Sequence, residues 1–215
     1  MTILIAGGDS FTWGSELADC DTNQHSNNTW SARLAQQLGM SYACVALPGG
    51  SNSSIARRVM RACANNRHKH DIAVAVMWTF ANRFEFRFTQ DTGERDTPWY
   101  SITPWTHESA VERIKSHFVN SSADILQHHV EHNRKMQRSG ISDFAKNYYM
   151  HVGDSEVWEY YSTYKEMLFL QQYLVANAIP YVFTHVEPLF VEQSVDIDLT
   201  VVRNQIDQDR CYIFD

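Results

Sequence analysis

The chain has 215 residues, of which 44% are hydrophobic and 20% are charged, a balance typical of one soluble globular domain. Its formal net charge of −7 argues against nucleic acid as a partner, because phosphate binding needs an excess of Lys and Arg. The four cysteines are widely spaced and match no zinc or disulfide pattern, which predicts free thiols. We therefore expect a small-molecule or carbohydrate ligand.

Each apolar run in the first half of the chain is followed by turn residues. The runs at 2–6, 42–47 and 72–77 have a composition typical of buried parallel strands. Apolar residues at helical spacing over 30–38 and 55–64 predict helices between these strands. The opening run is too short for a signal peptide or a membrane span, which predicts a cytoplasmic chain.

The last third of the chain resumes this alternation. Helical spacing from Val157 to about Asn177 predicts a long helix, and the runs 180–186 and 211–214 predict a fourth and a fifth strand. Alternating strands and helices predict an α/β fold, with a parallel five-stranded sheet covered by helices on both faces. Ligands of such sheets bind at the carboxyl ends of the strands.

Residues 86–155 break the alternation, and we interpret them as a mainly helical insertion within a single domain of residues 1–215. A helical pattern over 108–138 is interrupted at 120–122, which predicts two helices. Trp99 and Trp105 stand beside prolines in a predicted loop, where they would line a groove that stacks sugar or acyl groups. Packing within a core is the alternative for the aromatic residues of this region.

Ser10 follows the first predicted strand, after two glycines that permit a sharp turn. A serine at this edge of the sheet would be exposed beside a helix amino terminus, whose N–H groups stabilise a developing oxyanion. This position predicts a nucleophile. The alternative is that Asp9 or Ser10 only caps the helix that follows.

Three segments support the first interpretation, because they follow neighbouring strands and their loops converge. The segments GDSFTWG (8–14), ALPGGSN (46–52) and WTFANRFE (78–85) resemble the first three sequence blocks of the SGNH or GDSL hydrolase superfamily, in a divergent, phage-like form. The resemblance covers the first 85 residues. It implies a three-layer flavodoxin-like fold and hydrolysis of esters, often of acyl or acetyl groups on lipids or carbohydrates.

The resemblance also implies roles for particular residues. Ser10 would be the nucleophile and its own N–H an oxyanion donor, Gly49 would supply a second backbone N–H, and Asn82 a side-chain N–H. Gly50 is an alternative to Gly49, one residue away. The match of Asn82 departs from the family pattern, because the usual Gly-x-Asn-Asp spacing is replaced by Thr-Phe-Ala-Asn-Arg.

The Asp-x-x-His block that supplies the family's catalytic histidine does not occur in this sequence. A serine hydroxyl needs a base to take its proton. The base would then come from a longer native chain or from elsewhere in this sequence. The alternative is that the chain keeps the fold but has no base and is not catalytic. His185, at the end of the fourth predicted strand, is the best internal candidate, although a histidine satisfied by its neighbours is the simpler interpretation; His107 and His151 are weaker candidates.

Two clusters of charged or ligating residues favour a solvated surface over a site. His128 and His132 share a helical face, but zinc needs three or four ligands, so we predict no metal. The basic residues of the second helix and its end read as a solvated face, with binding of an anionic substrate as the alternative. They are Arg57, Arg58, Arg61, Arg67 and Lys69.

The sequence therefore supports three candidate functions, which we rank as follows. A serine esterase comes first, followed by a catalytically incomplete module on the same fold that binds carbohydrate or a protein partner. A domain that binds phosphate or a nucleotide at Gly7 and Gly8 comes last, because the sequence has no Gly-x-Gly-x-x-Gly or Walker pattern there. We accordingly expect no cofactor.

Overall fold

The computed structural model describes residues 2–20, 24–89, 98–108, 123–190 and 196–213. Its centre is a five-stranded sheet formed by β1 (Thr2–Gly7), β2 (Ser41–Cys44), β3 (Asp71–Trp78), β6 (Tyr181–His185) and β7 (Cys211–Tyr212). All neighbouring strands pair in parallel, in the order β2-β1-β3-β6-β7. The predicted five-stranded parallel sheet is therefore confirmed, and its strand order is compatible with a flavodoxin-like fold.

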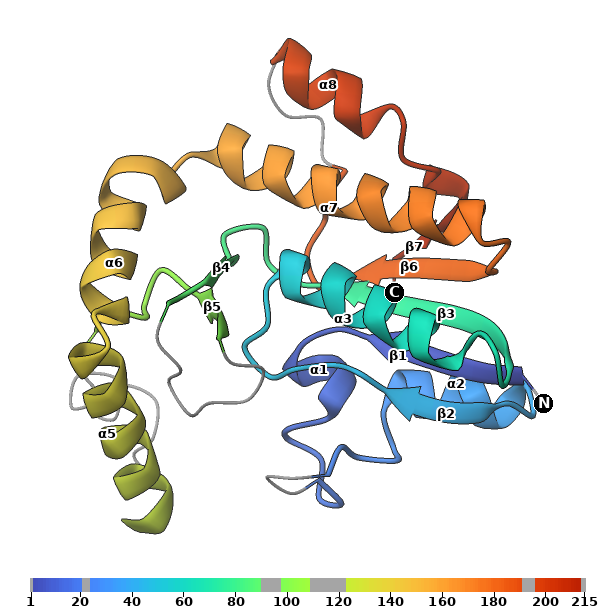
Figure 1. Ribbon diagram of the computed structural model, residues 1–215, viewed down its shortest axis with the longest axis horizontal. Helices are drawn as coiled ribbons and strands as arrows, with labels where there is room; N and C mark the ends of the chain where they lie inside the picture. The colour runs from blue at the N-terminus through green and yellow to red at the C-terminus, as the bar shows by residue number, and fades with distance from the viewer. Residues whose placement is uncertain (1, 21–23, 90–97, 109–122, 191–195, 214–215) are drawn as a thin grey trace.

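Helices cover both faces of this sheet (Figure 1). On one face α3 (Asn52–Asn66) and α7 (Glu156–Ala176) enclose the main core, and α8 (Ile197–Arg203) packs against α7. On the other face α2 (Trp30–Gln37) contributes Ala35 to a smaller core. The predicted helices 30–38 and 55–64 are thus present with slightly shifted ends.

The central strand β3 shows why the layers form. Its bulky residues, among them Val74, Val76 and Trp78, alternate with Ala73 and Ala75, and successive side chains of a strand point to opposite faces. The bulky set lies in the core beneath α3 and α7, and the alanines lie in the core beneath α2. Both faces are apolar, as expected for a parallel strand covered on both sides.

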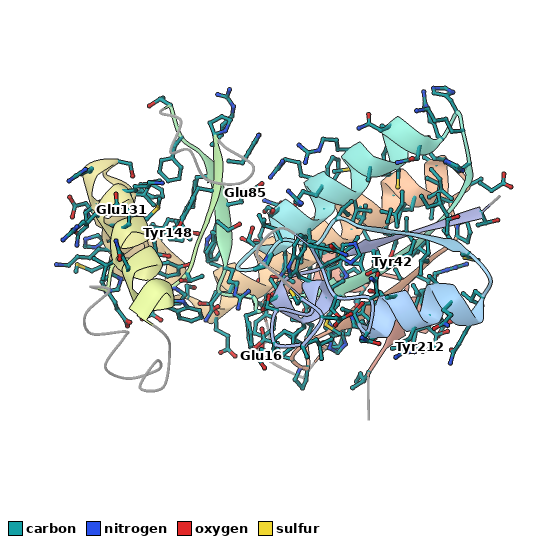
Figure 2. The ribbon with its side chains drawn as sticks, turned by 90° about the horizontal axis from the view of Figure 1, so that it is seen from below. Glu16, Tyr42, Glu85, Glu131, Tyr148 and Tyr212 are labelled. Atoms are coloured by element: carbon teal, nitrogen blue, oxygen red, sulfur yellow. The ribbon has the colours of Figure 1, made fainter. Side chains whose placement is uncertain are left out.

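The region after β3 contains a small module that the periodicity of the sequence did not predict. An antiparallel hairpin of β4 (Phe84–Arg87) and β5 (Trp99–Ile102) lies between α6 (Ile141–Tyr148) and α3 (Figures 1 and 2). Trp99 is therefore part of a strand and not of a loop. The strands of this hairpin have four residues each, too few for alternation to stand out in the sequence.

This module has an aromatic core of its own. Phe84, Ile102 and Ile141 are buried in it, and the ring of Phe86 contacts those of Phe144 and Tyr148 edge-on. The chain enters α6 from α5 (Ala123–Arg138) and leaves it through a π-helical turn, Tyr149–Gly153, that leads into α7. The predicted break at 120–122 lies outside the described residues.

Polar contacts attach the hairpin to the sheet through α3. The guanidinium of Arg57 donates to both carboxylate oxygens of Glu85, at 2.9 and 2.7 Å, and the N–H of Ser51 donates to the Ser101 hydroxyl at 3.0 Å. The loops that follow β5 are thereby held beside the carboxyl ends of the central strands. None of the described helices is long and apolar enough to cross a membrane.

Candidate functional site

Three loops meet at the carboxyl ends of β1, β2 and β3. The strand order reverses between β1 and β3, and such switch points are where open α/β sheets bind ligands. Ser10 follows β1, Gly49 follows β2 and Asn82 follows β3, so these three predicted site residues lie just after the carboxyl ends of neighbouring strands. The first two loops are joined directly, because the N–H of Leu47 donates to the carbonyl of Gly8 at 3.0 Å.

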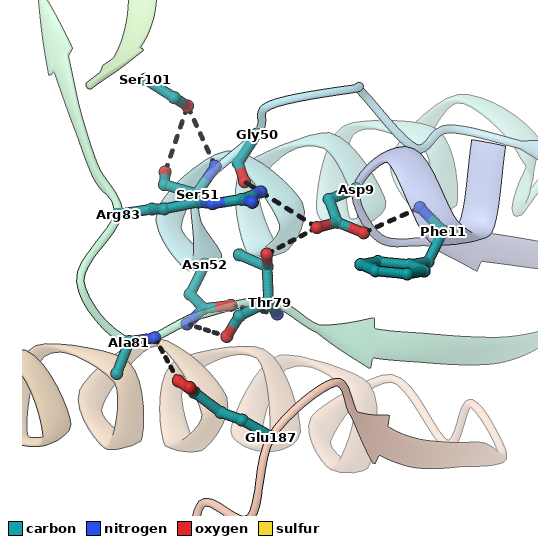
Figure 3. Close-up of polar contacts among 10 residues, drawn as sticks. All are labelled: Asp9, Phe11, Gly50, Ser51, Asn52, Thr79, Ala81, Arg83, Ser101 and Glu187. Atoms are coloured by element: carbon teal, nitrogen blue, oxygen red, sulfur yellow. Dashed lines mark hydrogen bonds and ion pairs between the residues drawn. The ribbon is translucent and has the colours of Figure 1, made fainter. Parts of the chain in front are cut away.

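Asp9 occupies the centre of this region (Figure 3). Its side chain is completely buried, and Oδ1 accepts a hydrogen bond from the N–H of Phe11 at 3.0 Å, which makes Asp9 the N-cap of α1 (Ser10–Trp13). Oδ2 accepts from the Thr79 hydroxyl at 2.7 Å and from Nη1 of Arg83 at 2.9 Å. The capping role considered for Asp9 or Ser10 therefore belongs to Asp9.

Ser10 is consequently the first residue of α1 and not its cap. The residue is half-buried, and among the described residues its hydroxyl has no hydrogen-bond partner. The glycine two positions earlier is needed for this turn, because a Cβ at Gly8 would lie 2.1 Å from Oγ1 of the buried Thr12. The local sequence thus leaves the Ser10 hydroxyl unengaged beside the first turn of a helix.

The two candidate glycines differ in how their N–H groups are used. Gly49 is exposed and has a left-handed φ of +75°, and its N–H donates to no described residue. The N–H of Gly50 donates to the carbonyl of Leu47 at 2.8 Å. Gly49 is therefore the one with a donor available for a ligand.

Asn82 lies on the loop between β3 and β4. Its carbonyl accepts a hydrogen bond from the Tyr149 hydroxyl at 2.7 Å, which ties this loop to the π-helical turn. Its Oδ1 is buried without a partner, and its Nδ2 donates to none of the residues that the structure describes. No hydrogen bond joins Ser10, Gly49 and Asn82 to one another in the described structure, and the hydrogen bonds between the three loops are made by their chain neighbours.

His185 ends β6 and pairs with Trp78 of β3. Its ring is buried, shares a face of the sheet with Phe183 and lies 6.0 Å from that of Phe190. Burial lowers its pKa, while a hydrogen bond to the backbone of Glu187 opposes that shift. Nε2 is buried without a hydrogen-bond partner in the described structure, and so makes no hydrogen bond to Ser10.

The other histidines considered as bases or ligands lie apart from this network. His107 and His151 are exposed, and neither is joined to Ser10 by a hydrogen bond within the described residues. The side chains of His128 and His132 lie outside the described part of the chain. Within that part, no group of three or more His, Cys, Asp or Glu residues is placed to hold a metal ion.

Two arginines of the predicted basic face make structural contacts. Arg57 pairs with Glu85 and lies 4.7 Å from the ring centre of Trp99, while Arg58 donates to the carbonyls of Val45 and Ala46. These contacts anchor α3 to the hairpin and to the loop after β2. None of the four cysteines, all of which lie in the described part of the chain, forms a disulfide.

Asn52 is a buried connector that sequence reasoning missed. Its side chain accepts from the N–H of Thr79 at 2.9 Å and donates to the Thr79 carbonyl at 3.2 Å and to the Thr163 hydroxyl at 3.1 Å. It therefore joins α3 to the end of β3 (Figure 3), and through Thr163 to α7. The available signal was its position directly after Ser51, the N-cap of α3.

Carboxylates gather on the side of the site that faces α7. Oε1 of Glu187 accepts from the N–H of Ala81 at 2.7 Å. Glu159 of α7 is half-buried, and burial together with the nearby charges of Asp154, Glu187 and Glu156 raises its pKa to about 7.

This raised pKa predicts a pH-dependent stability. The folded protein keeps the proton of Glu159 between the ordinary pKa of 4.5 and about 7, where the unfolded chain has released it. The contribution of this group to stability is therefore full below pH 4.5 and is lost as the pH rises through 7. We expect Glu159→Gln to raise the thermal midpoint more at pH 8 than at pH 5. Calorimetry of this variant against Glu16→Gln, an exposed control, checks the expectation, which an equal gain at both pH values would contradict.

No protein-family model, curated protein or solved structure matches the chain. The site is therefore interpreted from its own residues.

Proposed function

We propose that the chain is a serine esterase of the SGNH type, with Ser10 as its nucleophile. The observation that carries the proposal is the unengaged hydroxyl of Ser10 on the first turn of α1, at the carboxyl end of β1 and beside the switch point of the sheet. The unused N–H of Gly49 and Nδ2 of Asn82 on the neighbouring loops support it. Its substrates would be esters of small molecules or carbohydrates.

The reaction would proceed by acyl transfer. The Ser10 oxygen attacks the ester carbonyl carbon as a base takes its proton, and the carbonyl oxygen becomes an oxyanion. The N–H groups of Ser10 and Gly49 and Nδ2 of Asn82 would donate hydrogen bonds to this oxyanion. Removal of one such donor typically lowers kcat by roughly 10²- to 10³-fold. Expulsion of the alcohol leaves an acyl-serine, which water then hydrolyses.

His185 is the base that we retain for this step. Burial favours its neutral form, and Nε2, which has no hydrogen-bond partner among the described residues, can accept a proton when Nδ1 carries the ring hydrogen. Its ring lies in the core, so accepting the Ser10 proton requires the ring to turn toward the strand ends.

A second candidate function is a catalytically incomplete module that binds carbohydrate or a protein partner. The observation that favours it is that no imidazole or carboxylate of the described residues hydrogen-bonds to the Ser10 hydroxyl. Catalytic hydrogen bonds often shorten only when substrate binds, so the esterase remains the preferred proposal.

Labelling with a fluorophosphonate separates the two candidates. The probe forms a covalent bond with an activated serine, and we expect peptide mass spectrometry to locate the adduct on Ser10. Prior incubation with a short-chain ester should slow the labelling. Recovery of an unlabelled Ser10 from folded protein would reject the esterase and favour the binding module.

A further inference from the structure

Arg83 is a charged residue in a place where charge is unfavourable. Only 9% of its side chain is exposed, and burial lowers the pKa of its guanidinium although the Asp9 carboxylate opposes that shift. Its Nε is buried and donates to no described residue. Replacing a buried ion pair by apolar groups is often neutral or stabilising, so fold stability alone does not explain an arginine here.

The contacts of Arg83 join the three loops of the candidate site. Nη1 lies 2.9 Å from Oδ2 of Asp9, on the first loop, and 3.5 Å from the carbonyl oxygen of Gly50, on the second (Figure 3). Arg83 itself belongs to the third loop. One guanidinium therefore spans all three.

Each residue in this network is a chain neighbour of a residue proposed for catalysis. Asp9 precedes Ser10, Gly50 follows Gly49, and Arg83 follows Asn82. A peptide bond fixes adjacent Cα atoms 3.8 Å apart, so holding one member of each pair restricts the other. The network thus limits the relative positions of the hydroxyl and of the N–H donors.

Two aromatic rings, one on the loop after β3 and one in the insertion, also restrict the orientation of the Arg83 guanidinium. It lies 4.9 Å from the ring centre of Phe80, on the loop after β3, and 6.0 Å from that of Trp105, on the turn after β5. A guanidinium placed over aromatic rings is attracted to their faces. The turn that carries Trp105 therefore contributes to the orientation of Arg83.

We propose that Arg83 is a positioning residue for acyl transfer, which sets the distance between the Ser10 hydroxyl and the donors of Gly49 and Asn82. The inference rests on the proposed esterase function. It assigns Arg83 no contact with the substrate. Its effect on the reaction passes through Asp9 and Gly50.

The test compares Arg83→Met, Arg83→Lys and the double variant Asp9→Asn/Arg83→Met with the wild type. The double variant removes both charges but keeps an oxygen that can cap α1, so it should recover the stability that Arg83→Met loses. Esterase kinetics per active site, counted by fluorophosphonate titration, give kcat and KM separately. Arg210→Met is the matched control, because Arg210 also pairs with a carboxylate, that of Asp207, and lies 4.9 Å from an aromatic ring centre, that of Tyr181 at the start of β6, away from the strand ends that carry the site.

We expect kcat to fall roughly 100-fold in Arg83→Met and in the double variant, with KM within about threefold of wild type, since misplacing catalytic groups by about 1 Å has this effect. Arg83→Lys should retain more of the wild-type kcat than Arg83→Met does, and Arg210→Met should keep the wild-type kcat. Recovery of kcat together with stability in the double variant overturns the inference and leaves Arg83 a structural role. A wild-type protein without ester turnover or label at Ser10 overturns the proposed function itself.

Discussion

Ser10→Ala is expected to reduce hydrolysis of a short-chain chromogenic ester by about 10⁴-fold or more, as removal of the nucleophile does in serine hydrolases. The variant keeps the backbone N–H of residue 10 and the other donors, so weak stabilisation of an oxyanion remains. The side chain makes no hydrogen bond with the described residues, and the fold should therefore be unaffected. Turnover at saturating ester and the thermal midpoint are the two measurements.

Ser15→Ala is the matched control for this result. Ser15 lies just after α1, is exposed, and uses its backbone N–H to bond the carbonyl of Ser10 at 3.1 Å, a contact that alanine retains. Its turnover should equal that of the wild type. Equal activity of Ser10→Ala and Ser15→Ala would remove Ser10 from the mechanism, whatever the absolute rate.

Asp9→Asn is expected to lower the free energy of unfolding by about 3 to 5 kcal/mol, the usual effect of removing one partner of a buried ion pair. The asparagine still offers an oxygen to the N–H of Phe11, but Arg83 then remains buried without a counter-charge at 2.9 Å. Urea unfolding measured at neutral pH gives the quantity directly.

Glu131→Gln is the control for Asp9→Asn, because it removes one carboxylate from an ion pair that is exposed on both sides, Arg134 with Glu131 at 3.9 Å. Exposed pairs contribute at most about 1 kcal/mol, so its unfolding curve should nearly overlay that of the wild type. If both variants lost the same small amount, the Asp9 carboxylate would not be paired in solution as it is in the structure.

The parts of the fold that could be predicted are those in which every residue of an element obeys one local rule. β3 and α7 are long, and their apolar residues follow the periods of a strand and a helix, so both were predicted almost to their ends. The β4–β5 hairpin was not predicted, because its strands are short and their apolar side chains are buried against α6, which is distant in the sequence.

The candidate site divides in a similar way. Its loops could be predicted, because turn chemistry after consecutive strands places Ser10, Gly49 and Asn82 at one edge of the sheet. The buried links could not, because the ion pair of Asp9 with Arg83 joins residues 74 positions apart, and the hydrogen bonds of Asn52 reach residues 27 and 111 positions away. In a linear sequence a buried aspartate cannot be distinguished from an exposed cap.

The Tyr149 hydroxyl has a consequence for how firmly the outer helices hold the loop after β3. Its single hydrogen is shared between two carbonyl oxygens, 2.7 Å away on Asn82 and 3.0 Å away on Ile102. Burial raises the pKa of this phenol far above its ordinary value, so the hydroxyl keeps its hydrogen even in mildly alkaline buffer. The two hydrogen bonds of the Tyr149 hydroxyl should therefore persist in mildly alkaline buffer. A loss of activity there would be due to the titration of another group.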